Sequence, residues 1–398
     1  MTQVEKYKEL IENIFEQTID FSNVDIENNC IGALARINDF HIFRNNFIER
    51  LKRLREFFRH SEETTKELIN TIKSIAQTKG YKWSGPYSEL VALDYWIQFT
   101  SLRNIKYIDR GNVNDFEDSI AKKIGQQEID LDISFDLIGT KVYSDVKSLI
   151  PTHTELVDQI LKNLKSKVSK KDYLIGIDDV YEVDYLRTKE DYVYELQKGT
   201  LIAELAKCIN AEKRSYKHKL KSGATASFRI AYKEDGGNTI LSTMREMEPY
   251  KLAIDYKYKV LDYYNKLLLN QPSIITFVIN PWFNQELNGM SEFNRTFFRA
   301  LSRRVFIELA KNDNDMSAYF PELTGKNLKI SDVSSNLTGI VFIMDNSILV
   351  ENDNLYDGYV ALNPNAKNKC LDRRDFDVLN WTQGVKAPFI EDFYYDNY

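Results

Sequence analysis

The amino-acid sequence predicts an α/β protein in which a mixed sheet is flanked by helices and follows an N-terminal helical region. Apolar residues recur at helical spacing over residues 1–80. Over residues 81–398, alternating or apolar runs typical of strands are interleaved with helical stretches. We therefore expect two regions. The helical region, 1–80, would serve oligomerisation or contact DNA or a partner, and the domain at 81–398 would carry helical and basic inserts.

Composition restricts the classes of protein. The 398 residues are 43% hydrophobic and 28% charged, an ordinary balance for a folded chain with a sizeable core. The formal net charge is −6, so nucleic-acid binding would depend on local basic segments. Three widely separated cysteines favour a reducing compartment over a disulfide scaffold. No stretch has the length and apolarity of a membrane span, so we expect a cytoplasmic protein without membrane contact.

Taken in order, the chain begins with three amphipathic helices, whose apolar stripes lie within residues 4–15, 40–58 and 68–76. The run SELVALDYWIQFTSL then predicts a helix that carries Glu89, and residues 104–127 are expected to form a polar connection. Further strands are expected at 172–178, 273–279, 339–344 and 359–362. Further helices are expected at 155–165, 192–209, 250–269 and 294–310.

The segment 129–150 predicts a β-hairpin on which the rest of the interpretation depends. Apolar and polar residues alternate up to Leu137, and Gly139-Thr140 suits a two-residue turn with glycine first. If these two residues form the whole loop, the register is fixed. The expected opposed pairs are Asp136 with Tyr143, Ser134 with Asp145, and Asp132 with Lys147. One face then carries Asp132, Asp136, Asp145 and Lys147.

Three carboxylates share one lysine on this face. The face is therefore expected either to be exposed to water, where surplus charge costs little, or to bind a cation. Mg²⁺ accepts one or two carboxylates and keeps positions open for water and phosphate, which is what phosphodiester hydrolysis requires. A lysine two residues past an aspartate on a strand shares its face and can reach the attacking water. The alternative is an ordinary cross-strand ion pair between Asp132 and Lys147 on a solvated face.

The runs SELVALDYW and ISFDLIGTKVYSDVKSL resemble the PD-(D/E)xK nuclease superfamily, which has the restriction-endonuclease-like fold. The resemblance covers about residues 85–150. The chain departs from the pattern in having Phe135 where a proline often stands, and in having Asp rather than Glu as the last acid. The matching residues are Glu89, Asp136, Asp145 and Lys147.

The resemblance implies a role for each matching residue. Asp136 and Asp145 would ligate Mg²⁺, for which Mn²⁺ can substitute, and the carbonyl of Val146 would join them. Glu89 would help directly or through water, while Lys147 would orient the nucleophilic water and stabilise charge.

The implied activity is Mg²⁺-dependent endonucleolytic hydrolysis of DNA, in a restriction or anti-phage defence effector. The family also implies a homodimer or higher homo-oligomer, and an activating partner protein is compatible with it. Three alternatives remain open at this point. They are a catalytically inactive DNA-binding or scaffold protein of the same fold, an RNA-cleaving nuclease with the same site, and a hairpin whose acids are simply solvated.

The most basic segment, EKRSYKHKLKSGATASFR, begins at residue 212 and is our candidate for contacts with the DNA backbone. A solvated surface is the alternative, both here and for the arginines in 295–304. No phosphate-binding loop, nucleophile elbow or zinc-ligand spacing is present in the sequence. The candidate nucleic-acid-binding residues are Lys213, Arg214, Lys217, Lys219, Lys221 and Arg229.

Overall fold

The structure is a computed structural model of the whole chain. It describes residues 2–21, 30–35, 40–78, 80–112, 119–150, 159–169, 172–178, 194–195, 200–220, 223, 225–232, 248–269, 271–284, 287, 289, 291–351, 354–368, 373–377 and 386–393. The chain divides into two compact units, Met1–Leu149 with Lys259–Tyr398 (unit 1) and Ile150–Tyr258 (unit 2). The division does not fall at residue 80. The N-terminal helices belong to the same unit as the main sheet, and the separate unit is an insert.

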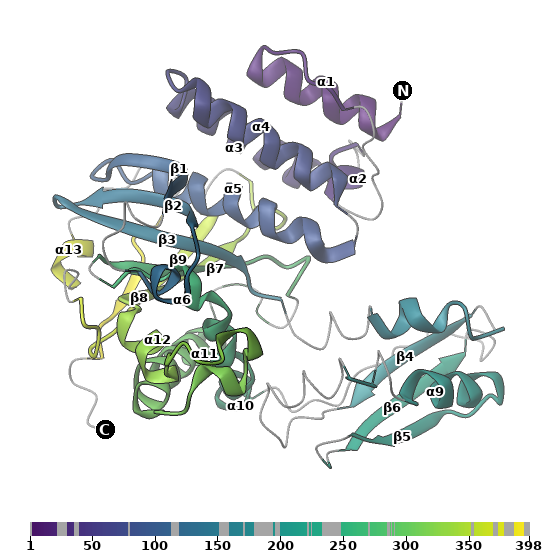
Figure 1. Cartoon of the computed structure of the whole chain (residues 1–398). Coiled ribbons are helices and arrows are strands. Elements are labelled where there is room, and N and C mark those ends of the chain that lie inside the picture. Colours follow the sequence, from purple (N-terminus) through teal and green to yellow (C-terminus); the bar gives the residue numbers. More distant parts are fainter. Residues whose placement is uncertain are drawn as a thin grey trace. The chain divides into compact units, whose positions relative to one another are not determined.

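Unit 1 is built around a mixed sheet that has seven strands in the described part of the chain (Figure 1). Their order across the sheet is β1-β2-β3-β7-β8-β9-β10. The strands are β1 (Arg103–Asn112), β2 (Glu128–Leu137), β3 (Thr140–Ser148), β7 (Ser273–Ile279), β8 (Gly339–Asp345), β9 (Tyr356–Leu362) and β10 (Phe389–Glu391). Neighbours are antiparallel at β1–β2, β2–β3 and β8–β9 and parallel elsewhere. The predicted mixed α/β class is confirmed.

Helices cover both faces of this sheet (Figure 1). On one face, α5 (Ser84–Ile97) packs Trp96 on Phe135 with ring centroids 4.7 Å apart. On the other, α11 (Glu292–Arg303) stacks Phe298 on Phe342 at 4.3 Å. The other α-helices in the described part of unit 1 are α1 (Gln3–Phe15), α2 (Cys30–Ala35), α3 (His41–Phe57), α4 (Glu62–Gln77), α6 (Ile120–Ile124), α12 (Ile330–Asn336) and α13 (Arg373–Asp377).

The predicted N-terminal helical region is confirmed. Its helices begin at side-chain caps where the sequence offers them, since Thr2 forms a capping box with Glu5 and Ser61 accepts a hydrogen bond from the Thr64 amide. The buried residues of α4 include Leu68 and Ile72, which recur at helical spacing. Both α3 and α4 contact α5. The N-terminal helices are therefore a further layer over the helix that carries Glu89.

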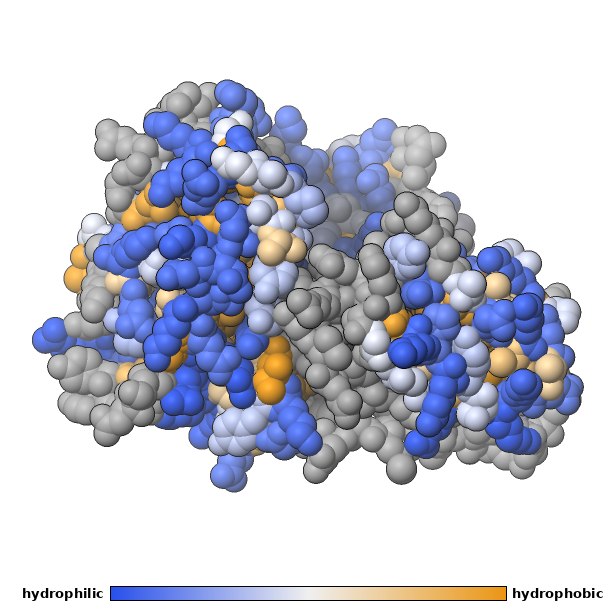
Figure 2. Space-filling model, turned by 60° about the horizontal axis from the view of Figure 1, so that its bottom comes forward, coloured by the Kyte–Doolittle hydropathy of each residue, from blue (hydrophilic) through white to orange (hydrophobic). Residues whose placement is uncertain are grey.

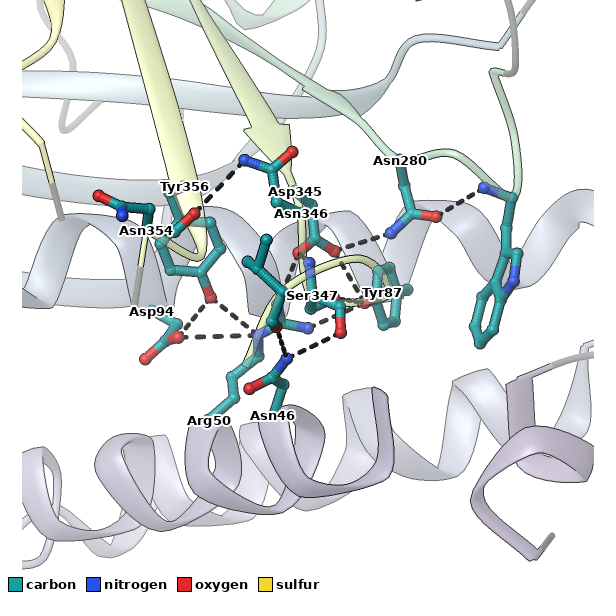
Figure 3. Close-up of polar contacts among 12 residues, drawn as sticks. Asn46, Arg50, Tyr87, Asp94, Asn280, Asp345, Asn346, Ser347, Asn354 and Tyr356 are labelled. Carbon is teal, nitrogen blue, oxygen red and sulfur yellow. Dashed lines mark hydrogen bonds and ion pairs between the residues drawn. The ribbon is translucent and has the colours of Figure 1, made fainter. Parts of the chain in front are cut away.

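A buried polar network fastens α3 to α5 and to the ends of β8 and β9 (Figure 3). The side chain of Arg50 is 0% exposed and lies 3.0 Å from Asp345 Oδ1, and its Nε donates to the Tyr356 hydroxyl at 2.9 Å. The Tyr87 hydroxyl accepts from Arg50 and donates to Asp345. Asp94, which is also fully buried, accepts hydrogen bonds from Tyr356 and Arg53. These contacts fix the helix register against the sheet.

Two sequence predictions are wrong, one within unit 1 and one across the boundary between the two units. The expected polar connection at 104–127 contains β1 and α6, because an edge strand with one neighbour tolerates polar residues that a central strand would bury at a cost. The long helix expected at 250–269 is instead α10 (Pro249–Tyr256) followed by a 3₁₀ helix, η4 (Lys257–Lys266).

Unit 2 contains the antiparallel sheet β4-β6-β5 and helix α9 (Leu201–Asn210) in its described part. The strands are β4 (Tyr173–Asp178), β5 (Ser215–Lys219) and β6 (Thr225–Tyr232). Leu205 and Ile209 of α9 share a core with Phe228 and Ile230 of β6. The basic segment therefore forms two paired strands, and β4 lies where a strand was predicted.

Among the described residues, no helix combines the length and the apolarity that crossing a membrane requires. Figure 2 shows that hydrophilic side chains cover much of the described surface on the face it presents, with apolar side chains in small patches between them.

Candidate functional site

The β2–β3 hairpin forms, but the predicted register is wrong. Leu137 pairs with Thr140 and Phe135 with Val142, so the loop is Ile138-Gly139. Both loop residues have positive φ, 49° and 79°. Positive φ at both positions is typical of the two-residue turns whose backbone twist matches that of the flanking strands. Glycine thus takes the second loop position instead of the first. A shift of two residues keeps every side chain on its predicted face and changes its partner.

Three charged residues meet where the described pairing of β2 and β3 ends. The described pairing ends at Ile133 and Ser144. Beyond it, the Val146 amide of β3 donates a hydrogen bond to the Asp132 side chain, at 2.7 Å from Oδ2. Lys147 Nζ lies 3.1 Å from Asp145 Oδ2 and 3.9 Å from Asp132 Oδ2. The lysine therefore bridges two aspartates. Both the predicted Asp145–Lys147 proximity and the Asp132–Lys147 pair are present.

Asp136 is not brought to this cluster. It lies opposite Lys141 in the sheet, and the Asn104 side-chain amide donates a hydrogen bond to its carboxylate. Four residues along a strand separate it from Asp132 by about 13 Å. The strand acid of the cluster is Asp132, and the placement of Asp136 there is corrected. The resemblance favours Asp136, whereas the predicted register places Asp132 and Asp136 equally near Asp145, and the two-residue shift moves Asp136 away from it.

Glu89 approaches the cluster from α5 and is held by a tyrosine. The Tyr107 hydroxyl of β1 donates to Glu89 Oε2 at 2.9 Å and forms a second hydrogen bond with Thr71 of α4. Tyr107 is only 4% exposed, so this hydroxyl has little access to water. The N-terminal helical region therefore takes part in orienting a residue of the site.

Electrostatics favour protonated acids in the cluster. Burial, and then the charge of Asp132, raise the pKa of Glu89 to about 8. The same two causes, in the same order, raise the pKa of Asp145 to about 7. Burial lowers the pKa of Lys147, but the charges of Asp145 and Asp132 outweigh it and the net shift is upward. Near neutral pH the raised pKa values therefore favour protonation of Glu89 and Asp145 beside a charged Lys147.

Two residues of η4 complete the surroundings. Lys147 Nζ lies 5.2 Å from the centroid of the Tyr263 ring, within range of a cation–π contact. Lys266 donates to the carbonyl of Asp130, and its charge lowers the pKa of Asp145. Neither residue was singled out from the sequence. Nothing in a helical-looking stretch more than a hundred residues downstream signals that it packs beside the hairpin.

The donor set suits a hard cation, although its side chains do not converge on one point. Across the described residues, no three His, Cys, Asp or Glu side chains form a metal-ligand arrangement. Yet neither oxygen of the buried Asp145 accepts a hydrogen bond of normal geometry from the described chain, despite the close approach of Lys147. A buried carboxylate with unused acceptor sites fits Mg²⁺, which prefers oxygen ligands.

The basic candidates belong to unit 2. Lys213 and Arg214 precede β5, Lys217 and Lys219 lie on it, and all four are exposed. Arg229 lies on β6 and is half-buried, whereas Lys221 lies outside the described residues.

Comparisons of this chain with protein-family models, with curated proteins and with solved structures each found no match. The functional interpretation therefore depends on the geometry of the chain itself. Beyond the predicted residues, that geometry adds Tyr107 and Tyr263 to the site and exchanges Asp136 for Asp132.

Proposed function

We propose that this protein is a Mg²⁺-dependent endonuclease that hydrolyses DNA phosphodiesters at Glu89, Asp132, Asp145 and Lys147. The observation that carries the proposal is the uneven charge of this cluster. Three acids share one lysine in a largely buried place, and two of the acids have strongly raised pKa values. Such an arrangement opposes folding unless protons or a cation neutralise it, and functional sites are where such arrangements occur.

Each side chain has a role that its position supports. Asp132 and Asp145, with the carbonyl of Val146 between Asp145 and Lys147, would hold Mg²⁺, which supplies Lewis-acid activation of water and phosphate. Glu89 is positioned by Tyr107 to accept a proton from the attacking water once the cluster is deprotonated. Lys147, fixed between two aspartates, would stabilise the charge that develops on the phosphate oxygens.

The architecture supports the resemblance to the PD-(D/E)xK superfamily. A helix with an acid, α5, precedes an antiparallel meander, β1-β2-β3, and the third strand carries Asp-x-Lys and pairs in parallel with β7. By analogy with that family we propose a restriction or anti-phage defence effector that acts as a homo-oligomer. In this proposal Asp132 takes the role that the resemblance implies for Asp136.

The proposal is tested by cleavage of plasmid DNA with Mg²⁺ or Mn²⁺, with EDTA as the control for metal. Asp132→Asn is expected to lower the rate at least about 100-fold, as removal of a group acting on the reacting atoms does. Asp136→Asn is the matched control, because it makes the same change four residues along the same strand, and it is expected to stay within about threefold of the parent. Lys147→Ala should abolish cleavage.

The outcomes are distinct. Loss of cleavage in Asp136→Asn with full activity in Asp132→Asn would refute the assignment made here. Cleavage of RNA but not DNA under the same metal would identify an RNA nuclease. If the protein binds Mg²⁺ without cutting, an effector that needs an activating partner or signal becomes the leading interpretation. If it neither binds metal nor cuts, the nuclease proposal is wrong.

A further inference from the structure

One face of the β5–β6 strand pair in unit 2 carries the basic residues of these two strands. Ser215 pairs with Arg229, Lys217 with Ser227, and Lys219 with Thr225. Directly opposed residues point to the same face of a sheet. Lys217, Lys219 and Arg229 therefore share one face, together with small hydroxyl residues. We call this set of six positions the basic face.

The opposite face carries the aromatic residues and is covered by the core. His218 and Phe228 are buried in the core that α9 closes. The Tyr216 hydroxyl lies 2.8 Å from His218 Nδ1, and Glu195 Oε2 lies 3.1 Å from His218 Nε2. Because His218 is buried and side chains alternate along a strand, Lys217 and Lys219 point away from the core. The six positions of the basic face include no aromatic residue.

The two lysines of the basic face are uncompensated. Lys217 and Lys219 are exposed and form no ion pair with an acid within the described part of the chain. They stand two residues apart on an extended strand, about 7 Å.

Residues 150–258 contain 19 lysines and arginines against 17 aspartates and glutamates, while the whole chain has a formal net charge of −6. Positive charge is thus concentrated in the insert of an acidic protein.

From these features we infer that the basic face binds the phosphate backbone of duplex DNA. Exposed, unpaired lysines bind phosphates without reading bases. Binding of single strands commonly uses exposed aromatic side chains as stacking platforms, and the aromatic residues of these strands lie on the other face. Unit 2 is then a sequence-independent DNA-holding module. The choice of DNA as ligand rests on the proposed function, but binding is separate from catalysis.

The test measures binding of a 30-bp duplex to the full chain in EDTA by fluorescence anisotropy over a range of salt concentrations. The parent carries Lys147→Ala so that no cleavage can occur. Adding Lys217→Gln and Lys219→Gln should weaken binding on the order of tenfold near 0.15 M salt. It should also reduce the slope of log K against log salt by about 1.8, since each lost phosphate contact removes about 0.9.

The matched control is Lys165→Gln with Lys167→Gln. Both lysines are exposed in unit 2 and follow the segment whose Ile160 and Leu164 belong to the covered core. The same charge is removed there, so binding and its salt slope should be unchanged. Equal losses in the two double variants, or no loss in the first, would overturn the inference, as would tighter binding of a single strand. If the protein does not cleave DNA but the binding results are as expected, the inference about the basic face holds while the proposed nuclease activity does not.

Discussion

Two charged clusters contact helix α5, and they differ in how their charges are balanced. In the network of Figure 3, Arg50 lies beside Asp94 and Asp345. Arg53 also donates to Asp94, so each of these four groups has hydrogen-bonded partners. In the site cluster, three acids share Lys147, and both oxygens of Asp145 lack a hydrogen bond of normal geometry from the described chain. Both clusters lie in the same unit, and each includes residues from α5 and from strands of the same sheet.

The difference separates a structural role from a functional one. Buried charges that are paired and hydrogen-bonded can fix the register of packed elements, here α3 against α5 and the strand ends of β8 and β9. Charges left in excess oppose folding, and proteins keep them where a ligand or a reaction uses them. Breaking the first cluster should therefore cost stability, while neutralising the second should cost activity.

The largest expected effect on stability is that of Arg50→Met. The substitution leaves Asp345 and Asp94 buried beside fewer cations, and removing one partner of a buried ion pair typically lowers the free energy of unfolding by about 3–5 kcal/mol. Urea denaturation measures the loss. Arg59→Met is the control, because Arg59 pairs with Glu56 at the surface and its loss should change little. A loss below about 1 kcal/mol for Arg50→Met would contradict the structural role.

The same substitution placed in each cluster sharpens the comparison. Asp345→Asn weakens an acceptor of hydrogen bonds from Arg50, Tyr87 and Asn280, and should destabilise the protein by about 2–3 kcal/mol. Asp145→Asn removes a repelling charge, and should leave the metal-free protein as stable as the parent or slightly more stable at pH 8. It should also abolish the Mg²⁺-dependent rise in Tm, which a ligand specific for the folded state causes. Comparable destabilisation by both variants would refute the distinction.

The sequence predicted the strands better than it predicted the contacts between them. Alternation over residues 129–137 and the apolar run 273–279 identified β2 and β7, because burial imposes these patterns. The register depended on whether Gly139 takes the first or the second loop position, and the sequence allows both. The resemblance favoured Asp136 over Asp132, and only the observed register, in which Asp136 lies opposite Lys141, separates Asp136 from the cluster. The contribution of Tyr107 could not be predicted, because β1 is a polar edge strand and only tertiary packing brings its hydroxyl to Glu89.

The stability of the metal-free protein should fall as pH rises. The folded-state pKa values of Glu89 and Asp145, about 8 and about 7, exceed their ordinary values of 4.5 and 3.8. Their stabilising contribution is therefore complete below about pH 4 and is lost as pH rises through the folded values. Mg²⁺ must displace these protons, so its effect on Tm should be small at pH 6 and large at pH 8.5. An equal effect of Mg²⁺ at both pH values would contradict the assignment.

The smallest predicted effect concerns Tyr107. Its hydrogen bond to Glu89 lowers the pKa of that carboxyl against the larger effect of burial. Tyr107→Phe should therefore raise the pKa of Glu89 further. The part of the pH profile in which Mg²⁺-dependent activity rises with pH should then move to higher pH by about 0.5–1 unit. Because the substitution acts on the pKa of Glu89, the rate at high pH, where Glu89 is deprotonated in both proteins, should change little. A purely structural role would instead lower the rate at every pH.

Tyr95→Phe is the matched control for this substitution. Tyr95 lies on α5, is fully buried, and its hydroxyl has no hydrogen-bond partner within the described part of the chain. Removing that hydroxyl leaves the hydrogen bond between Tyr107 and Glu89 in place, and the pH profile should not move. If both variants shift the profile equally, the effect arises from packing of α5, and Tyr107 is not a positioning residue. If only Tyr107→Phe does so, the hydroxyl on β1 tunes the acid that the proposal assigns to proton transfer.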